Sequence, residues 1–310
     1  MTILNEGDLF MGQTLREIYG KYFQEMMKFS KAPAKIDNTN VYQEANKDLT
    51  PYMEMILKEN FLPGSGLGNP ENFKSFYEQV VNEGKRGLIL MEHYTNLDLP
   101  AIIYLLKIYG EKWAADFSER IVAVAGMKLN EADPAVRIWT EGFTRVVIYP
   151  TRSLDGVAGS DISEEEKKAE EKKARTINLA AMRAMDDCKK RGQVVLVFPS
   201  GTRYRPGHPE TKKGLREIDS YLRLFDIVLP VAVNGNCLRI NEENEKDMLA
   251  DIVTKDKLVL TAHPVLNCKE YRDSILNSLP ADDPDPKQKT IDGIMDILEK
   301  THNEAEKTRL

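Results

Sequence analysis

Hydrophobic residues in the first part of the chain recur at the spacing of α-helices. Between residues 9 and 30 they follow each other at intervals of three and four, which predicts an amphipathic helix built on Leu15, Ile18, Tyr19, Tyr22, Phe23, Met26 and Met27. Thr50 before Pro51 and Asn69 before Pro70 predict the starts of two more helices, because Pro fits the first helical turn. The stretch PGSGLGNP at 63–70 predicts a loop between them. We therefore predict a small helical domain over residues 1–80.

From about residue 86 the pattern changes to short apolar, β-branched runs that alternate with helical stretches. The runs predict strands at 87–92, 120–126, 145–150, 193–199 and 227–233. The segments between them predict helices at 99–109 and 134–141, a long helix that ends near Arg191, and a helix from about residue 213. This alternation is typical of an α/β fold with a largely parallel sheet flanked by helices, which we assign to residues 81–310.

Composition and charge narrow the class of protein. The net charge of −6 argues against general nucleic-acid binding, which needs an excess of positive charge. The longest apolar runs fall far short of the roughly 20 residues of a membrane span, and MTILNEGDLF does not have the pattern of a targeting peptide. The 3 cysteines form no C-x-x-C pair, which fits a reducing compartment. We expect a cytoplasmic protein, with peripheral contact to a membrane left open, and we expect the charged run at 164–173 to be a solvated helix face.

The first stretch that contains candidate catalytic residues is EHYTNLDLP at 92–100. His93 follows a predicted strand, and Asp98 lies five residues later, before Pro100 in the first turn of the next helix, which Asp98 is placed to cap. Ligands of α/β sheets bind at the carboxyl ends of the strands. A His held by an Asp is oriented to accept a proton, so this pair is a candidate general base. A helix-capping Asp beside an unrelated His is the alternative, and the spacing alone does not exclude it.

The second stretch is FPSGTRYR at 198–205. Its turn holds Ser200, Gly201 and Thr202, and Gly201 lets backbone amides approach a ligand. Arg203 and Arg205 follow, and their planar guanidinium groups suit contact with phosphate. Ser200 does not stand in the G-x-S-x-G pattern of a hydrolase nucleophile, and the chain has no Walker A loop.

A third stretch, RVVIYPTRS at 145–153, ends a predicted strand in Thr151 and Arg152. It adds a third guanidinium group at the same edge of the sheet. The 4 histidines lie without the spacing of metal ligands, so we predict no metal ion.

The order of these stretches resembles the four sequence blocks of the glycerolipid acyltransferases. EHYTNLDLP resembles the first block, VIYPTR the second, FPSGTR the third, and Leu229, Pro230 and Val231 the fourth. The sequence Pro-Ser-Gly-x-Arg-x-Arg at 199–205 and VAGMKLNEADP at 124–134 are similar to the soluble, plastid-type glycerol-3-phosphate 1-acyltransferases and their bacterial relatives. The likeness covers roughly residues 69–235. Tyr149 and Pro150 replace the basic, histidine-rich second block of that branch, while Phe198 and Thr202 are closer to the wider family.

The resemblance implies a reaction and a role for each residue. His93 would take the proton from the sn-1 hydroxyl of glycerol-3-phosphate as this oxygen attacks an acyl thioester, and Asp98 would orient His93. Arg152, Arg203 and Arg205 would bind the substrate phosphate, with Ser200, Gly201 and Thr202 supporting the turn. The co-substrate would be acyl-CoA or acyl carrier protein, with no further cofactor.

Three alternatives stay open from the sequence. The acceptor could be lysophosphatidate, as in 1-acylglycerol-3-phosphate acyltransferases. A thioesterase would use water in place of the alcohol, and a non-catalytic lipid- or anion-binding module would use the same fold without chemistry. Lys212, Lys213 and Arg216 could offer a basic landing site for an acidic carrier protein, or simply form a solvated helix start.

Overall fold

A mostly parallel sheet forms the centre of the molecule. The structure, a computed structural model, describes residues 12–131, 134–150, 163–245 and 247–309. Five parallel strands lie in the order β5-β4-β6-β3-β7. They are β3 (Gly87–Met91), β4 (Ile121–Gly126), β5 (Arg145–Ile148), β6 (Val194–Val197) and β7 (Ile227–Asn234). The predicted α/β class and all five predicted strands are confirmed.

Shorter strands extend this sheet at both ends. β1 (Tyr42–Gln43) pairs antiparallel with β5. On the other side, β10 (Val259–Ala262) and β11 (Leu266–Asn267) pair antiparallel with β7, and β2 (Gly66–Gly68) pairs parallel with β10. The predicted loop at 63–70 is therefore wrong for 66–68, where the glycine-rich chain adopts the extended conformation that lets its backbone join β10.

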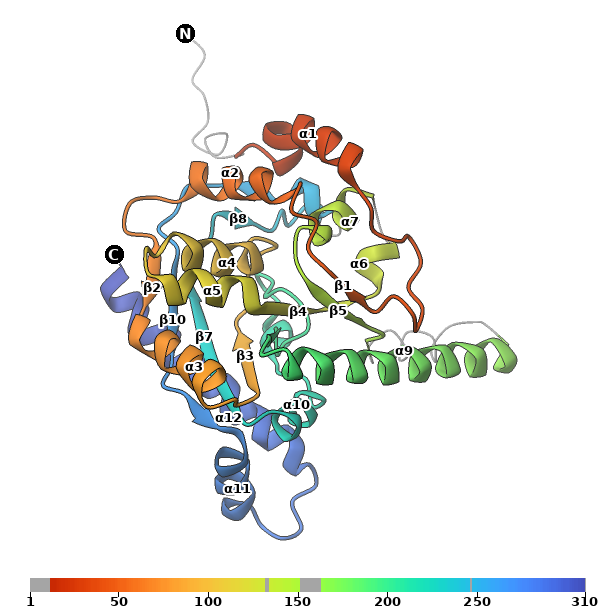
Figure 1. Ribbon diagram of the computed structural model, residues 1–310, viewed down its shortest axis with the longest axis vertical. Helices are drawn as coiled ribbons and strands as arrows, with labels where there is room; N and C mark the ends of the chain where they lie inside the picture. Colours follow the sequence, from red (N-terminus) through yellow and green to blue (C-terminus); the bar gives the residue numbers. More distant parts are fainter. Residues whose placement is uncertain (1–11, 132–133, 151–162, 246, 310) are drawn as a thin grey trace.

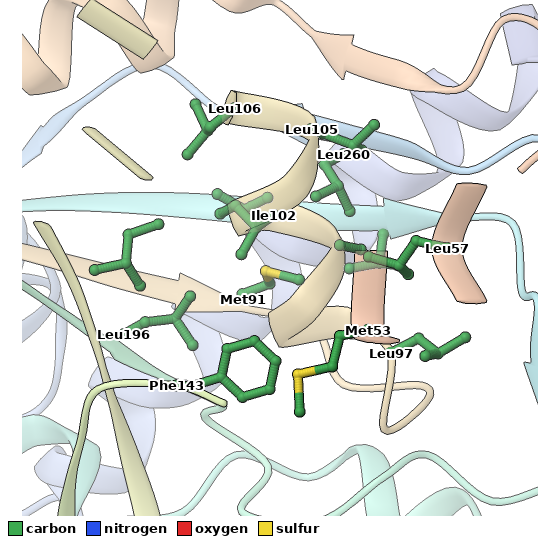
Figure 2. Close-up of a cluster of buried hydrophobic side chains, with 14 of the residues drawn as sticks. Met53, Leu57, Met91, Leu97, Ile102, Leu105, Leu106, Phe143, Leu196 and Leu260 are labelled. Carbon is green, nitrogen blue, oxygen red and sulfur yellow. The ribbon is translucent and has the colours of Figure 1, made fainter. Parts of the chain in front are cut away.

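One face of the sheet is covered by α2 (Thr50–Asn60), α3 (Pro70–Asn82), α4 (Asp98–Ile108) and α5 (Lys112–Arg120). Figure 2 shows Ile102, Leu105 and Leu106 of α4 among buried side chains of the sheet, with Met53 and Leu57 of α2 nearby. Because successive strand residues point to opposite faces, Ile89 and Met91 of β3 belong to this core.

The opposite face is covered by α9 (Glu164–Lys190), α10 (Ile218–Leu224) and α12 (Pro286–Arg309). Leu88 and Leu90 of β3 point into this second core. Burial on both faces explains why the central strands are continuous apolar runs. The charged run at 164–173 forms the first part of α9, which extends beyond the rest of the molecule (Figure 1), and its solvated character is confirmed.

The remaining elements connect and cover these layers. Their bounds are α1 (Leu15–Met26), η2 (Met27–Phe29), α6 (Lys128–Glu131), α7 (Pro134–Glu141), η3 (Pro209–Lys212), β8 (Leu238–Arg239), η4 (Met248–Ala250), β9 (Ile252–Val253) and α11 (Cys268–Ser278). α1 starts after a capping box between Thr14 and Glu17 and not at the predicted residue 9, and η2 continues it to Phe29.

Two predicted helix starts differ from the structure. Thr50 is the first residue of α2 and not its N-cap. The helix expected from about residue 213 begins at Ile218 instead. The intervening chain is tied elsewhere, because the Leu215 amide donates to the Pro199 carbonyl (2.8 Å) and Gly214 packs closely against Ile291.

The first 80 residues are not all helical, since β1 and β2 belong to the sheet. Residues of α1, α2 and α3 also share one hydrophobic core with α4 and α5. The division into domains at residue 80 remains a prediction. Across the described ranges, every helix is too short or too polar to cross a bilayer.

Candidate active site

His93 lies in the loop directly after β3, at the carboxyl edge of the parallel sheet. Its Nδ1 lies 2.9 Å from Oδ2 of Asp98. The Asp98 side chain is 1% exposed, whereas that of His93 is 17% exposed and lines a cavity. The structure thus brings the two residues of the predicted base together, with the carboxylate inside and the imidazole facing open space.

The carboxylate of Asp98 also organises the loop that carries His93. Oδ2 accepts the backbone N–H groups of Tyr94 (2.6 Å) and Thr95 (2.8 Å), and Oδ1 accepts the Thr95 hydroxyl (3.1 Å). The predicted capping role is wrong, because α4 begins at Asp98 itself and Leu97 is its N-cap. Asp98 turns back toward the preceding loop and fixes the loop and the imidazole with one group.

The loop of His93 is joined to the FPSGTRYR stretch. The Phe198 ring stacks on the His93 imidazole, with centroids 3.9 Å apart and planes at 14°. The backbone N–H of Tyr204 donates to the His93 carbonyl (2.7 Å). Because β3 and β6 are neighbours in the sheet, two stretches about a hundred residues apart in sequence meet at its edge.

The turn after β6 is tightly built. Ser200 is fully buried and its hydroxyl donates to the Thr202 carbonyl (2.7 Å), so it supports the turn and is not exposed as a nucleophile. Gly201 has φ +63°, and a Cβ there would lie 2.4 Å from Cδ1 of Leu215. A left-handed backbone and a close neighbour both require glycine at this position.

The two arginines of the stretch have acidic partners in the structure. Arg203 is 7% exposed, and its Nη1 binds Oδ2 of the fully buried Asp251. Burial raises the pKa of Asp251 to about 6, although the charge of Arg203 acts in the opposite direction. The Arg205 side chain is 38% exposed, and its Nη1 lies 3.4 Å from Oε2 of Glu245. Arg205 is thus the more accessible of the two cations.

The third predicted cation, Arg152, lies outside the described residues, as does Thr151. The residues just before them, Tyr149 and Pro150, line the same cavity as His93. They follow β5, whose carboxyl end lies at the same edge of the sheet as the end of β3.

The cavity beside His93 has a volume of about 540 Å³. Its walls come from the carboxyl ends of β4 and β6 and from helices α7, α9 and α10. Most lining side chains are apolar, among them Leu129, Val136, Trp139, Met182, Met185, Leu215, Tyr221 and Leu224. His93, Phe198 and Gly201 lie on its wall, so the candidate base faces a space that an extended apolar group can enter.

Trp139 links the cavity to the His93 loop, a contact that was not expected from the sequence. Its indole N–H donates to the Asn96 carbonyl (3.1 Å), and its ring packs against Phe23 of α1 at 5.8 Å. The stacking of Phe198 on His93 was also missed. The position of Phe198 at a strand end, next to the motif, is the signal that could have indicated its contact, whereas Trp139 lies within α7 and the sequence carries no such signal for it.

A second polar cluster lies behind the His93 loop. The imidazole Nδ1 of His302, on α12, lies 2.9 Å from Oε2 of the buried Glu92. The rings of Tyr94 and Tyr204 pack edge to face at 4.8 Å beside it. Burial, followed by the charge of Glu92, raises the pKa of both tyrosines, so their hydroxyls stay neutral.

Within the described ranges, no group of three His, Cys, Asp or Glu side chains is arranged to hold a metal ion. The absence of a metal from the reaction remains a prediction. No protein-family model matches this chain, and no curated protein matches it in sequence.

Proposed function

We propose that this protein is an acyltransferase that moves a fatty acyl group from an acyl thioester to the sn-1 hydroxyl of glycerol-3-phosphate, the first step of phospholipid synthesis. The observation that carries the proposal is the His93–Asp98 pair at the wall of a large apolar cavity. A base that faces apolar space suits a reaction between a small polar alcohol and a long acyl chain.

In the proposed reaction the imidazole of His93 acts as the general base. His93 takes the proton of the acceptor hydroxyl while the oxygen attacks the thioester carbonyl carbon. When the tetrahedral intermediate collapses, the C–S bond breaks and the imidazolium returns the proton to the leaving thiolate. The Asp98 carboxylate accepts the hydrogen bond of Nδ1 and stabilises the imidazolium that forms. The step needs no cofactor beyond the acyl-CoA or acyl carrier protein that donates the chain.

In this proposal the phosphate of the acceptor binds at the turn that carries Arg203 and Arg205. Arg205 is exposed enough to reach it, and a phosphate would compete with Glu245, which lies 3.4 Å away. Arg203 has five N–H donors, of which Asp251 engages Nη1, so others remain for a ligand. Arg152 completes the proposed set by resemblance. The protein would then act in the cytoplasm, with peripheral membrane contact for release of its lipid product.

Replacement of His93 by Ala tests the proposal directly. We expect thiol release from acyl-CoA with glycerol-3-phosphate to fall by about 10²- to 10⁴-fold, the usual contribution of a general base. His263→Ala is the control, since Nδ1 of His263 bonds to the neighbouring Pro264 carbonyl and lies away from the cavity. Wild-type turnover in His93→Ala would exclude His93 as the general base.

Lysophosphatidate remains the second candidate acceptor. A product analysis with both acceptors separates the two reactions.

A further inference from the structure

The residue before the candidate base, Glu92, is a buried carboxylate with a structural task. β3 ends at Met91, whereas its neighbour β7 continues to Asn234. The Glu92 N–H still donates to the Val231 carbonyl (3.1 Å), but the chain then leaves the sheet. Oε2 of Glu92 accepts the N–H of Val233 (2.8 Å) and so takes the place of the missing strand. Glu92 thereby fixes the point where the His93 loop departs.

The same oxygen of Glu92 meets a histidine from the far end of the chain. Nδ1 of His302 lies 2.9 Å from Oε2, and the Tyr94 hydroxyl lies 3.4 Å from the same nitrogen. Asn234, at the end of β7, donates to the His302 carbonyl (3.0 Å) and to Glu306 (2.7 Å). The last turns of α12 are therefore bound to the strand beside the catalytic loop, and the C-terminus lies near β10 and β2 in Figure 1.

The imidazole of His302 is in contact with the carboxylate of Glu92 and can act as its cationic partner. The Glu92 side chain is 5% exposed, and a buried carboxylate without a cationic partner is costly. Burial lowers the pKa of His302, but the hydrogen bond and charge of Glu92, together with Glu306, outweigh burial and the net pKa is raised.

Other groups also face this pair. Lys212 of η3 opposes the proton on His302, and its Nζ lies 5.9 Å from the Tyr94 ring and 5.4 Å from the Tyr204 ring. Glu299 of α12 adds negative charge near both tyrosines. Carboxylates outnumber cations here, so the cluster suits a protonated imidazole and does not suit an anionic ligand.

We propose that His302 is a positioning residue of the active site: it holds Glu92, and through Glu92 the backbone that presents His93, so that its protonation sets the response of the site to alkaline pH. This inference rests on the proposed function for its kinetic consequences. His93 is held from the other side by Tyr204 and Phe198, so a loosened Glu92 would let the loop shift without unfolding the protein.

The direction of the pH effect follows from the raised pKa. The ion pair contributes fully to the free energy of unfolding below the pKa of an unfolded histidine, near 6.5. The contribution is lost as the pH rises through the higher pKa of the folded protein. The free energy of unfolding and kcat should therefore decline together as the pH rises through the pKa of His302 in the folded protein.

His302→Gln is the test variant, because its amide can still donate to Glu92 but does not titrate. We expect kcat at pH 7 to fall about tenfold, less than the roughly hundredfold cost of misplacing a reacting group by 1 Å. We expect KM for glycerol-3-phosphate to stay unchanged, and the alkaline decline of kcat to flatten. His263→Gln is the matched control and should keep the wild-type profile. An alkaline limb that is the same in His302→Gln and in the wild type would overturn the inference.

A second measurement works even if the protein transfers no acyl group. Histidine NMR titration of the wild type should give His302 a pKa above 6.5, and Glu92→Gln should lower it. In His302→Gln the ring signals of His93 should move, whereas His263→Gln should leave them in place. A normal His302 pKa with unmoved His93 signals would refute the positioning role, whatever the assay of the proposed function shows.

Discussion

The Asp98 side chain has two structural roles: it holds the backbone of the His93 loop and it binds the His93 imidazole. Its Oδ2 accepts the imidazole Nδ1–H and two backbone N–H groups, while its Oδ1 accepts only a hydroxyl among the hydrogen bonds of the described residues. An asparagine can place its oxygen at Oδ2 and its amide nitrogen toward the Thr95 hydroxyl. The loop would then keep its bonds but lose the negative charge.

Asp98→Asn should therefore separate the two tasks. We expect kcat to fall by about 10²- to 10⁴-fold because the neutral amide does not stabilise the imidazolium, while the midpoint of thermal unfolding changes by only a few degrees. Asp48→Asn is the control, as Asp48 forms an exposed ion pair with Lys31. A variant with full activity would exclude a catalytic role for the Asp98 charge.

The ion pair between Arg203 and Asp251 binds the turn at 198–205 to the chain beyond β8. Both side chains are almost fully buried, at 8% and 0% exposed. Breaking a buried pair leaves an uncompensated charge, which costs more than the pair itself contributes.

Asp251→Ala should lower the free energy of unfolding by about 3–5 kcal/mol, measured by urea denaturation. Asp273→Ala removes the partner of the exposed Lys269 and should cost less than about 1 kcal/mol. Equal effects of the two substitutions would mean that the buried pair does not hold the turn.

Sequence reasoning predicted the candidate site at the residue scale only in part. The types and order of His93, Asp98, Arg203 and Arg205 could be read from the chain, since they stand in recognisable stretches. The partners Asp251, Glu245 and His302 could not, because each comes from a distant segment that carries no motif. Both arginines looked free for phosphate in the sequence, whereas in the fold Arg203 binds Asp251 and Arg205 lies 3.4 Å from Glu245.

At the scale of elements, the connection between β6 and α10 carries Arg203 and Arg205 and is hydrogen-bonded to the His93 loop. The Gly201 N–H donates to the Phe198 carbonyl (2.9 Å), and Leu215 returns to bond with Pro199. Gly207 lies further along the same segment with a similar φ of +72°, but no described atom lies within 4 Å of where its Cβ would be.

This pair of glycines offers a matched test. Gly207→Ala should cost about 1–2 kcal/mol of stability, the price of a left-handed backbone for alanine. Gly201→Ala should cost about 1–3 kcal/mol more, because its Cβ also meets Leu215. It should also raise KM for glycerol-3-phosphate. If urea denaturation gives the same loss of unfolding free energy for both variants, the close contact between residue 201 and Leu215 does not contribute to the destabilisation.

The strands were the easiest elements to predict and the ends of helices the hardest. Apolar runs rich in β-branched residues identified all five central strands, because strands buried on both faces consist mostly of apolar residues. The late start of α10 and the strand at 66–68 depend on contacts with Ile291 and with β10, which local pattern does not contain.

At the scale of the whole molecule, the cavity exists because three layers do not fill the carboxyl edge of the sheet. Residues of α7, α9 and α10 enclose it together with β4 and β6. Its volume of about 540 Å³ could not be predicted from sequence, since each apolar wall residue looks like an ordinary core residue.

Filling the cavity should change which acyl chains are accepted. Val136 of α7 lines it, and Val136→Trp should lower kcat/KM for long-chain thioesters more than for medium-chain ones. Val81→Trp, on the outer face of α3 at 39% exposed, is the control and should leave chain preference unchanged. An unaltered chain-length profile in Val136→Trp would place the acyl chain elsewhere.

The most direct test of the proposed acyl transfer is product identification with purified protein, two acceptors and two donors. Glycerol-3-phosphate and lysophosphatidate are each incubated with acyl-CoA and with acyl carrier protein, for the wild type and for His93→Ala. We predict 1-acylglycerol-3-phosphate from the wild type, with thiol release that depends on glycerol-3-phosphate and is lost in the variant. Free fatty acid formed at the same rate without any acceptor, or no thioester turnover with either donor, would contradict the assignment.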